Sequence, residues 1–226
     1  MLDQTKHKQV MTRILLGLMS EKSLAAKLGF KGGTALYLFY ELDRFSTDLD
    51  FDLVGNGGEA EIKLINKIMA DNLAITDQKN KRFTWYWMGS YEKGEHKIKL
   101  EVNTRQYPNE YELKDFRGYS IRIMKPEYMM AHKLCAVLDR THLQNRDLYD
   151  VWWMLKHDFP IKEEIVKLRM GENLQKYWGS LLKKVDDIPA DYDILSGLGE
   201  LMDYRKKDWI KIKFLKELRV ELASRA

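Results

Sequence analysis

The spacing of apolar and polar residues separates the chain into a mixed first half and a helical second half. Apolar residues recur at helical spacing from Gln4 to Lys27, and again from Thr34 to Leu42 after a run of glycines. Residues 47–54 alternate strictly between polar and apolar, which is the two-residue period of a β-strand with Leu49 and Phe51 on its buried face. The first half therefore combines helices with at least one half-buried strand.

Further elements follow this strand. A glycine-rich turn precedes a predicted helix, and the predicted strands after it are rich in β-branched and aromatic residues. After Pro126 the pattern becomes helical to the end of the chain. The helix is expected at Glu59–Asp71, the strands at Arg82–Tyr91, Lys97–Asn103 and Tyr119–Met124, and later helices begin near Pro126, Asn145 and Pro160, with at least two more beyond Met170. We predict an α+β fold: a mixed sheet with flanking helices in residues 1–125, followed by an all-α portion in residues 126–226.

Composition supports a folded protein and excludes several classes. Of the 226 residues, 45% are hydrophobic and 32% are charged, which is unlike the profile of a disordered chain. No early apolar stretch is long enough for a signal core or a bilayer span, so we expect a cytoplasmic protein with no membrane contact. The only cysteine, Cys135, is predicted to be a small buried hydrophobe, and it leaves no disulfide or thiolate zinc site within one chain.

The net charge of +4 is modest, but the basic residues are concentrated at the end of the chain. Residues 201–226 carry eight Lys or Arg against four Asp or Glu. Such a helix is able to present its cations to a phosphate backbone. The alternative is a solvated helix face, and the sequence does not decide between the two.

Three aspartates occupy the polar face of the strand at 47–54. Asp48, Asp50 and Asp52 are two residues apart, so their carboxylates lie roughly 6–7 Å apart and repel one another. A divalent cation relieves this repulsion, and magnesium takes oxygen ligands while keeping positions for phosphates. The alternative is a solvated edge strand. Asp52 is expected to bond the turn at Gly55 and to take no part in metal binding.

The segment before this strand favours the metal interpretation. Gly32, Gly33 and Thr34 open a helix that leads back to the acidic strand through a short turn. Glycines allow backbone to approach phosphate closely, and the free N–H groups at the start of a helix attract anions. A phosphate cradle and metal ligands in one helix-then-strand unit form a more specific signal than either part.

These residues carry a resemblance to a known family. Gly32-Gly33-Thr34 followed by Asp48-Leu49-Asp50 resembles the signature of the polymerase-beta nucleotidyltransferase superfamily. The blocks KGGTAL, RFSTDLDFDL, AHKLCAVLDR and NRDLYDVWWML, which lie within Lys31–Leu155, resemble the AbiEii/AbiGii-type nucleotidyltransferase toxins. The resemblance implies a nucleotidyltransferase sheet, a magnesium site with two metal ions, and transfer of a nucleoside monophosphate from a nucleoside triphosphate (NTP). It also implies an RNA acceptor, transfer RNA above all, and a toxin of a toxin–antitoxin or phage-defence system with a cognate antitoxin.

The resemblance also assigns roles to later residues. Glu101 would be a second-metal ligand or the base for the acceptor hydroxyl, although alternation places it beside Lys99, with which it is equally able to pair. Lys133 shares a helical stripe with apolar residues, and the resemblance places it in the active site with Asp147. Asp147 also stands at a predicted helix start, where an acidic side chain is favoured by the dipole.

Arg44 and Ser46 lie inside a matching block and are candidates for binding the nucleotide. For Arg44 the alternative is a surface ion pair at a turn. His132 is expected to be packed or hydrogen-bonded, with no catalytic role.

Two other functions stay open. One is a small-molecule or protein nucleotidylating enzyme, such as an antibiotic-modifying one. The other is a nucleotide-binding module without turnover, against which the presence of both Asp48 and Asp50 argues. In the favoured interpretation, residues 126–226 form a helical domain that closes the nucleotide site.

Overall fold

The protein was analysed as a computed structural model, which describes residues 2–92 and 96–226. The chain divides into two compact units, Met1–Lys125 and Pro126–Ala226. Among the described residues, no helix has both the length and the apolar character needed to cross a bilayer.

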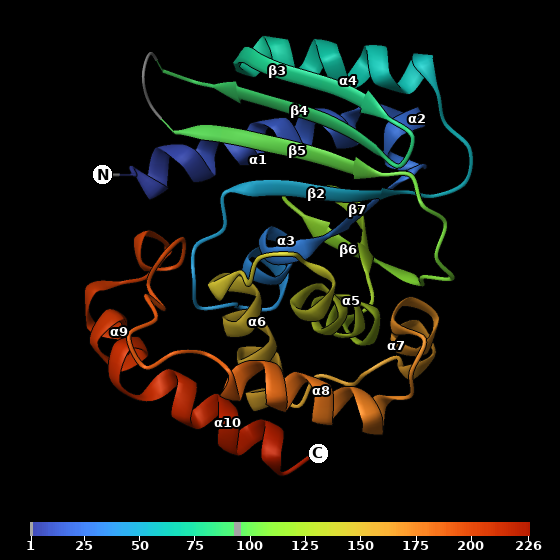
Figure 1. The fold of residues 1–226 in the computed structure, drawn as a ribbon. Coiled ribbons are helices and arrows are strands. Elements are labelled where there is room, and N and C mark those ends of the chain that lie inside the picture. The colour runs from blue at the N-terminus through green and yellow to red at the C-terminus, as the bar shows by residue number, and fades with distance from the viewer. Residues whose placement is uncertain (1, 93–95) are drawn as a thin grey trace. The chain divides into compact units, whose positions relative to one another are not determined.

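The first unit is built on a mixed sheet of seven strands in the order β3-β4-β5-β2-β1-β7-β6 (Figure 1). β2 lies in the middle, antiparallel to β1 on one side and parallel to β5 on the other. The strands are β1 Leu28–Lys31, β2 Asp48–Leu53, β3 Ala74–Lys81, β4 Thr84–Ser90, β5 Lys97–Asn103, β6 Tyr111–Phe116 and β7 Tyr119–Met124. A central strand has both edges paired, so its side chains are held in a fixed register.

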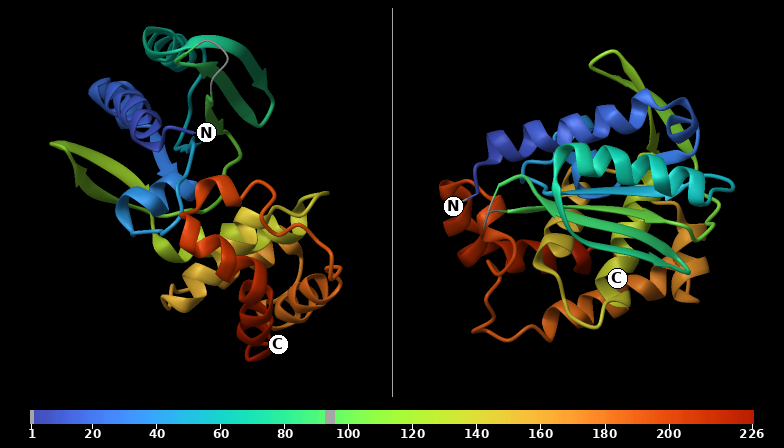
Figure 2. Two further views of the ribbon diagram at one scale, coloured as in Figure 1. Left: turned by 90° about the vertical axis from the view of Figure 1, so that its left-hand side faces the viewer. Right: turned by 90° about the horizontal axis from the view of Figure 1, so that it is seen from above.

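Four helices accompany the sheet: α1 Gln4–Ser20, α2 Lys22–Ala25, α3 Gly32–Phe39 and α4 Glu59–Asn72. α1 and α4 pack side by side, and α1 also contacts β2 and β7 (Figure 2). Leu49 and Phe51 of β2 are fully buried, as their alternation predicts. The buried faces of α1 and the central strands therefore form the core of this unit.

The structure corrects several expected elements. β1, β3 and β6 were not predicted, and α3 begins at Gly32 and ends at Phe39, where a helix was expected over Thr34–Leu42. The short β1 was hidden by the glycines that follow it. β3 is an edge strand with almost every residue exposed, so it carries no apolar alternation that would mark it in the sequence.

The second unit contains only helices among its regular elements, and the α+β prediction with an all-α second part is confirmed. The helices are α5 Pro126–Asp139, α6 Asn145–Lys156, α7 Glu163–Met170, α8 Leu174–Asp186, η1 Gly199–Leu201, α9 Tyr204–Trp209, η2 Ile210–Phe214 and α10 Leu215–Ala223. Cys135 is buried in α5, as expected, and this burial raises the pKa of its thiol to about 11.

Candidate active site

The polar face of β2 meets the polar face of β5. The register of these parallel strands places Asp48 beside Lys99, Asp50 beside Glu101 and Asp52 beside Asn103. Since paired residues of neighbouring strands project to the same side, the aspartates of β2 and the polar residues of β5 share one surface.

Lys99 lies close to the carboxylates of Asp48 and Glu101. Its Nζ lies 3.3 Å from Oδ2 of Asp48 and 3.7 Å from Oε2 of Glu101. Burial raises the pKa of Asp50, and the charges of Asp48 and Glu101 raise it further, while Lys99 and Lys31 act in the opposite direction. Burial is the main cause of this increase, and the two lysines do not cancel it.

A tight glycine turn presses against Asp50. Gly32 has φ +79°, a left-handed conformation that favours glycine, and a Cβ added there would lie 2.6 Å from Oδ2 of Asp50. A Cβ on Gly33 would lie 2.8 Å from Nη2 of Arg44 and 2.9 Å from Oγ of Ser46. The start of α3 therefore reaches the acidic strand only because both residues lack a side chain.

Buried polar side chains hold this turn against β2. Oγ1 of Thr34 donates to the carbonyl of Asp48 and lies 2.9 Å from Oγ of Ser46. Nη1 of Arg44 donates to the carbonyl of Phe45 at 2.9 Å, and the residue is only 3% exposed. The surface position in the alternative for Arg44 is therefore wrong, because its guanidinium lies inside the turn.

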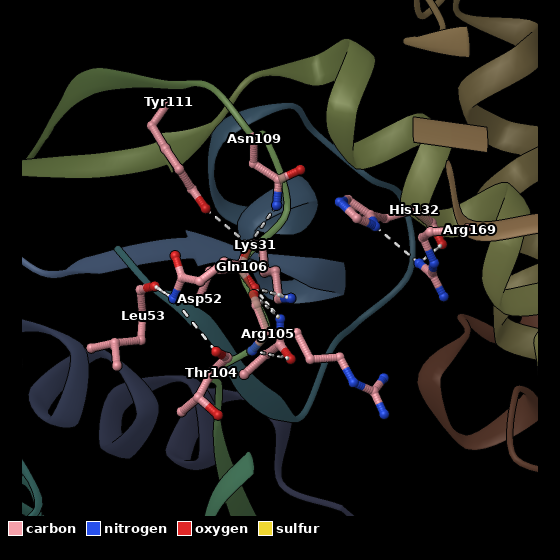
Figure 3. Close-up of polar contacts among 11 residues, drawn as sticks. Lys31, Asp52, Leu53, Thr104, Arg105, Gln106, Asn109, Tyr111, His132 and Arg169 are labelled. Carbon is pink, nitrogen blue, oxygen red and sulfur yellow. Dashed lines mark hydrogen bonds and ion pairs between the residues drawn. The ribbon is translucent and has the colours of Figure 1, made fainter. Parts of the chain in front are cut away.

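Asp52, the third aspartate of β2, is surrounded by hydrogen-bond donors (Figure 3). Its Oδ1 accepts from Nδ2 of Asn103 at 2.8 Å and from Nζ of Lys31. Its Oδ2 accepts from Nδ2 of Asn109 and from the hydroxyl of Tyr111, each at 2.9 Å. The expected bond to the turn at Gly55 is wrong, because these four donors saturate the carboxylate.

The surroundings of Asp52 also set its ionisation. Burial tends to raise the pKa of Asp52, but the positive charge of Lys31 and the hydrogen bonds from Asn103, Lys31 and Tyr111 outweigh burial, so the pKa is lowered. Burial raises the pKa of Tyr111, and the charge of Asp52 and the hydrogen bond to it raise this pKa further. Asp52 is therefore a buried carboxylate with a complete set of partners.

A second cluster of charges lies within the helical unit. Nζ of Lys133 on α5 is 3.2 Å from Oδ1 of Asp147 and 2.6 Å from Oδ2 of Asp150, both on α6. Nε of Arg140 is 3.1 Å from Oδ2 of Asp147. Both aspartates are almost fully buried, so Lys133 is clamped between two carboxylates that have little access to water.

Asp150 was missed from the sequence. It stands three residues after Asp147 on one helix, and that spacing places both on the same face, which was the available signal. His132 accepts a hydrogen bond at its Nδ1 from Nη1 of Arg169 at 2.9 Å, in keeping with the expectation that it is packed or hydrogen-bonded (Figure 3).

The residues predicted from the sequence fall into two sets. Asp48, Asp50, Glu101 and the turn formed by Gly32, Gly33, Thr34, Arg44 and Ser46 come together in the first unit, and Lys133 with Asp147 in the second. In the part of the chain that the structure describes, no three or more His, Cys, Asp or Glu side chains form a group close enough to hold a metal ion by themselves.

Comparison with known proteins identifies the family. The family described as "Nucleotidyl transferase AbiEii toxin, Type IV TA system" matches residues 13–209, most of the chain. The chain belongs to the AbiEii nucleotidyltransferase toxin family. Among curated proteins, no sequence matches it.

Solved structures agree with the AbiEii assignment. A Helicobacter pylori protein described as a nucleotidyltransferase is 28% identical, with a TM-score of 0.64, and the match covers 99% of this chain and 95% of that one. JHP933 of Helicobacter pylori is 27% identical, with a TM-score of 0.63 and coverage of 99% and 92%. An antigenic nucleotidyltransferase-like protein of Paracoccidioides brasiliensis shares the fold at 16% identity, with a TM-score of 0.52 and coverage of 85% and 92%.

Every candidate residue named above lies inside the segment that matches the AbiEii family. The family resemblance recognised in the sequence is thus confirmed, and so is a nucleotidyltransferase-like sheet with a helical carboxy-terminal portion. A transferase is the activity class that membership in this family supports.

Proposed function

We propose that this AbiEii protein is a magnesium-dependent nucleotidyltransferase that moves a nucleoside monophosphate from an NTP onto RNA. The observation that carries the proposal is the contact between the Gly32-Gly33 turn and Asp50. It joins a backbone able to approach phosphate with a carboxylate able to hold a cation.

Asp48 and Asp50 are the proposed magnesium ligands. Magnesium is commonly held by one or two carboxylates together with waters and substrate phosphates, so two aspartates on one face fit the ion. The carboxylates of Asp48 and Glu101, which both act on Asp50, support the same assignment. When bound, magnesium would neutralise charge on the phosphates and help to orient them. Glu101, which is paired with Asp50 in the register, is our candidate for a second-metal ligand or for the base.

The turn and the helical unit supply the proposed phosphate contacts. Backbone N–H groups of Gly32, Gly33 and Thr34 at the start of α3 would donate to phosphate oxygens. Arg44 and Ser46 support this turn from inside and are proposed to help to bind the nucleotide. Lys133 would neutralise the triphosphate, with Asp147 orienting its ammonium group.

The proposed reaction is an in-line displacement at the α-phosphorus. An acceptor hydroxyl oxygen forms a bond to phosphorus as the bond to the bridging oxygen breaks, and pyrophosphate leaves. The proton of the hydroxyl passes to a base, for which Glu101 is the candidate. Most of the rate enhancement would come from positioning and charge neutralisation.

The family description supports a toxin as the biological role, and a cognate antitoxin is the proposed protein partner. We propose RNA, in particular transfer RNA, as the acceptor because blocking translation in the cytoplasm accounts for toxicity. A phage-defence role is compatible with the same chemistry. The competing acceptors are a protein or a small molecule such as an antibiotic.

Labelling identifies the nucleotide and the acceptor in one experiment. The protein is incubated with each of the four α-labelled NTPs, magnesium and total RNA, and the products are separated into RNA, protein and small-molecule fractions. We expect label in RNA from one preferred NTP, and no label when a chelator replaces magnesium. Label only in protein or in a small molecule would overturn the RNA acceptor, and no transfer from any NTP would overturn the enzyme itself.

A further inference from the structure

A basic groove runs along α1. It encloses about 770 Å³ and is lined by α1, by Tyr37 of α3, by Phe45 and by the turn between β6 and β7. Its lining residues from α1 are Gln4, Thr5, Lys6, Lys8, Gln9, Val10, Thr12, Arg13 and Leu16, and Arg117 comes from the turn. The groove thus belongs entirely to the first unit.

The charge of the groove has a single sign. Four of its twelve lining residues are cations, Lys6, Lys8, Arg13 and Arg117, and none is an Asp or Glu. Lys6 is paired with Glu92 outside the lining. Arg13 is exposed and makes no ion pair or hydrogen bond within the described part of the chain. The groove therefore attracts anions.

The cations are spread along the groove and alternate with neutral hydrogen-bonding groups. Thr5, Lys8 and Thr12 form one row on α1, and Gln9 and Arg13 belong to a second, because residues three and four apart share a helix face. From Lys6 to Arg13 the helix rises about 10 Å. A row of separated cations with hydroxyl and amide groups fits successive phosphates and sugars of a polymer better than one compact anion.

One partly exposed aromatic ring, that of Tyr37, gives the groove a further feature of nucleic-acid sites, and the buried Phe45 supports it from behind. Nζ of Lys8 lies 4.7 Å from the centroid of the Tyr37 ring and 3.3 Å from its hydroxyl. Tyr37 and Phe45 pack edge to face with centroids 5.5 Å apart. Aromatic surface beside cations is typical of sites for single-stranded nucleic acid.

The groove lies close, along the sequence, to the start of β2. Phe45 lines the groove, and Asp48 begins β2 three residues later. On the inner side of the same helix, the ring Nε2 of His7 lies 3.0 Å from the carbonyl of Thr47. α1 is therefore fastened directly to the residue that precedes Asp48.

We propose that this groove binds the phosphate backbone of the RNA acceptor and leads it toward the start of β2. The inference rests on the proposed function in taking RNA as the acceptor. It assigns the RNA surface to α1, whereas the sequence had directed attention to the basic residues of the carboxy-terminal helix.

The test compares two variants with the same change in net charge. The groove variant combines Lys8→Gln, Arg13→Gln and Arg117→Asn. Asparagine is used at position 117 because that residue has a positive φ of 54°, which asparagine tolerates. The tail variant combines Lys211→Gln, Lys213→Gln and Lys216→Gln, three exposed lysines of the carboxy-terminal helices. Binding of labelled transfer RNA and of a single-stranded RNA is measured without NTP over a range of salt concentrations.

We expect the groove variant to bind RNA about 100-fold more weakly at ~0.1 M salt, with the salt slope reduced by about two, as the loss of three phosphate contacts predicts. The tail variant should bind like the wild type. Melting temperatures of all proteins show whether folding is intact, and the single variant Arg13→Gln, at an exposed residue without partners, keeps the test valid if the triple variant is unstable.

Two outcomes overturn the inference. These are wild-type RNA binding by the groove variant and loss of RNA binding in the tail variant alone. Failure of the proposed function gives a different result, since an RNA that binds in the groove but receives no label refutes the transfer reaction and leaves the groove in place.

Discussion

The two halves of β2 carry the same residue type on the same face, yet their aspartates have different environments. Asp52, in the second half, is saturated by an ammonium group, two amides and a hydroxyl. Asp50, in the first half, is buried against a glycine turn, and the carboxylates of Asp48 and Glu101 lie near it together with the ammonium groups of Lys99 and Lys31. The comparison teaches that a row of alternating aspartates is not a functional unit: a carboxylate with a full set of donors is structural, and a buried one that lies among further carboxylates is a candidate for binding a cation.

The largest effect is expected in the first half of β2. Asp50→Asn should reduce nucleotidyl transfer by about 10³-fold or more, because a proposed metal ligand is lost together with several kcal/mol of charge stabilisation. Its melting temperature should be unchanged or higher, since one of three neighbouring carboxylates is removed. Asp48→Asn should lose transfer equally, with at most about 1 kcal/mol of stability lost with its partly exposed ion pair to Lys99. Transfer at the wild-type rate in either variant would refute the assignment.

In the second half of β2, substitution should lower stability, whereas in the first half it should lower activity. Asp52→Ala is expected to lower the free energy of unfolding by about 3–5 kcal/mol, because Lys31 loses its buried counter-charge and three further donors lose their acceptor. Urea unfolding measures the change. Tyr111→Phe, which removes a single donor, is the graded control and should cost about 1.5–3 kcal/mol. A stable Asp52→Ala protein without transfer activity would mean that both halves of the strand act in catalysis.

The smallest expected effect concerns Lys133. For this residue too, the question is whether it acts in folding or in binding the substrate. Lys133→Ala should weaken NTP binding by about 1–3 kcal/mol, roughly 5- to 150-fold, as loss of a charge-assisted contact predicts. Because the variant also leaves Asp147 and Asp150 without their lysine, affinity must be measured by calorimetry well below the melting temperature.

Asp150→Asn is the matched control for Lys133→Ala, because it disturbs the same buried cluster but keeps the ammonium group. If both variants lose NTP affinity to the same extent, the cluster acts through folding and resembles Asp52. If only Lys133→Ala loses affinity, Lys133 contacts the nucleotide.

The sequence predicted those parts of the site that depend on local spacing. The alternation of residues 47–54 gave the strand and the common face of its aspartates, and the glycines gave the turn before α3. Partners that are distant along the chain could not be predicted from local spacing. The role of Asp52 depends on Asn109 and Tyr111, which approach it through strand pairing and a long loop. The burial of Arg44 likewise depends on the space left by Gly33, a fact about packing that no periodicity records.

Strand β1 passes beneath the ring of Tyr111, where a Cβ on Gly29 would lie 2.2 Å from a ring carbon. Any inherited change at position 29 is consequently blocked unless position 111 has already become smaller, and a smaller residue at 111 removes a donor from Asp52. The order in which mutations are tolerated is thereby restricted. The exposed edge strand β3 is free to vary one position at a time, whereas a change at position 29 is tolerated only after a change at position 111.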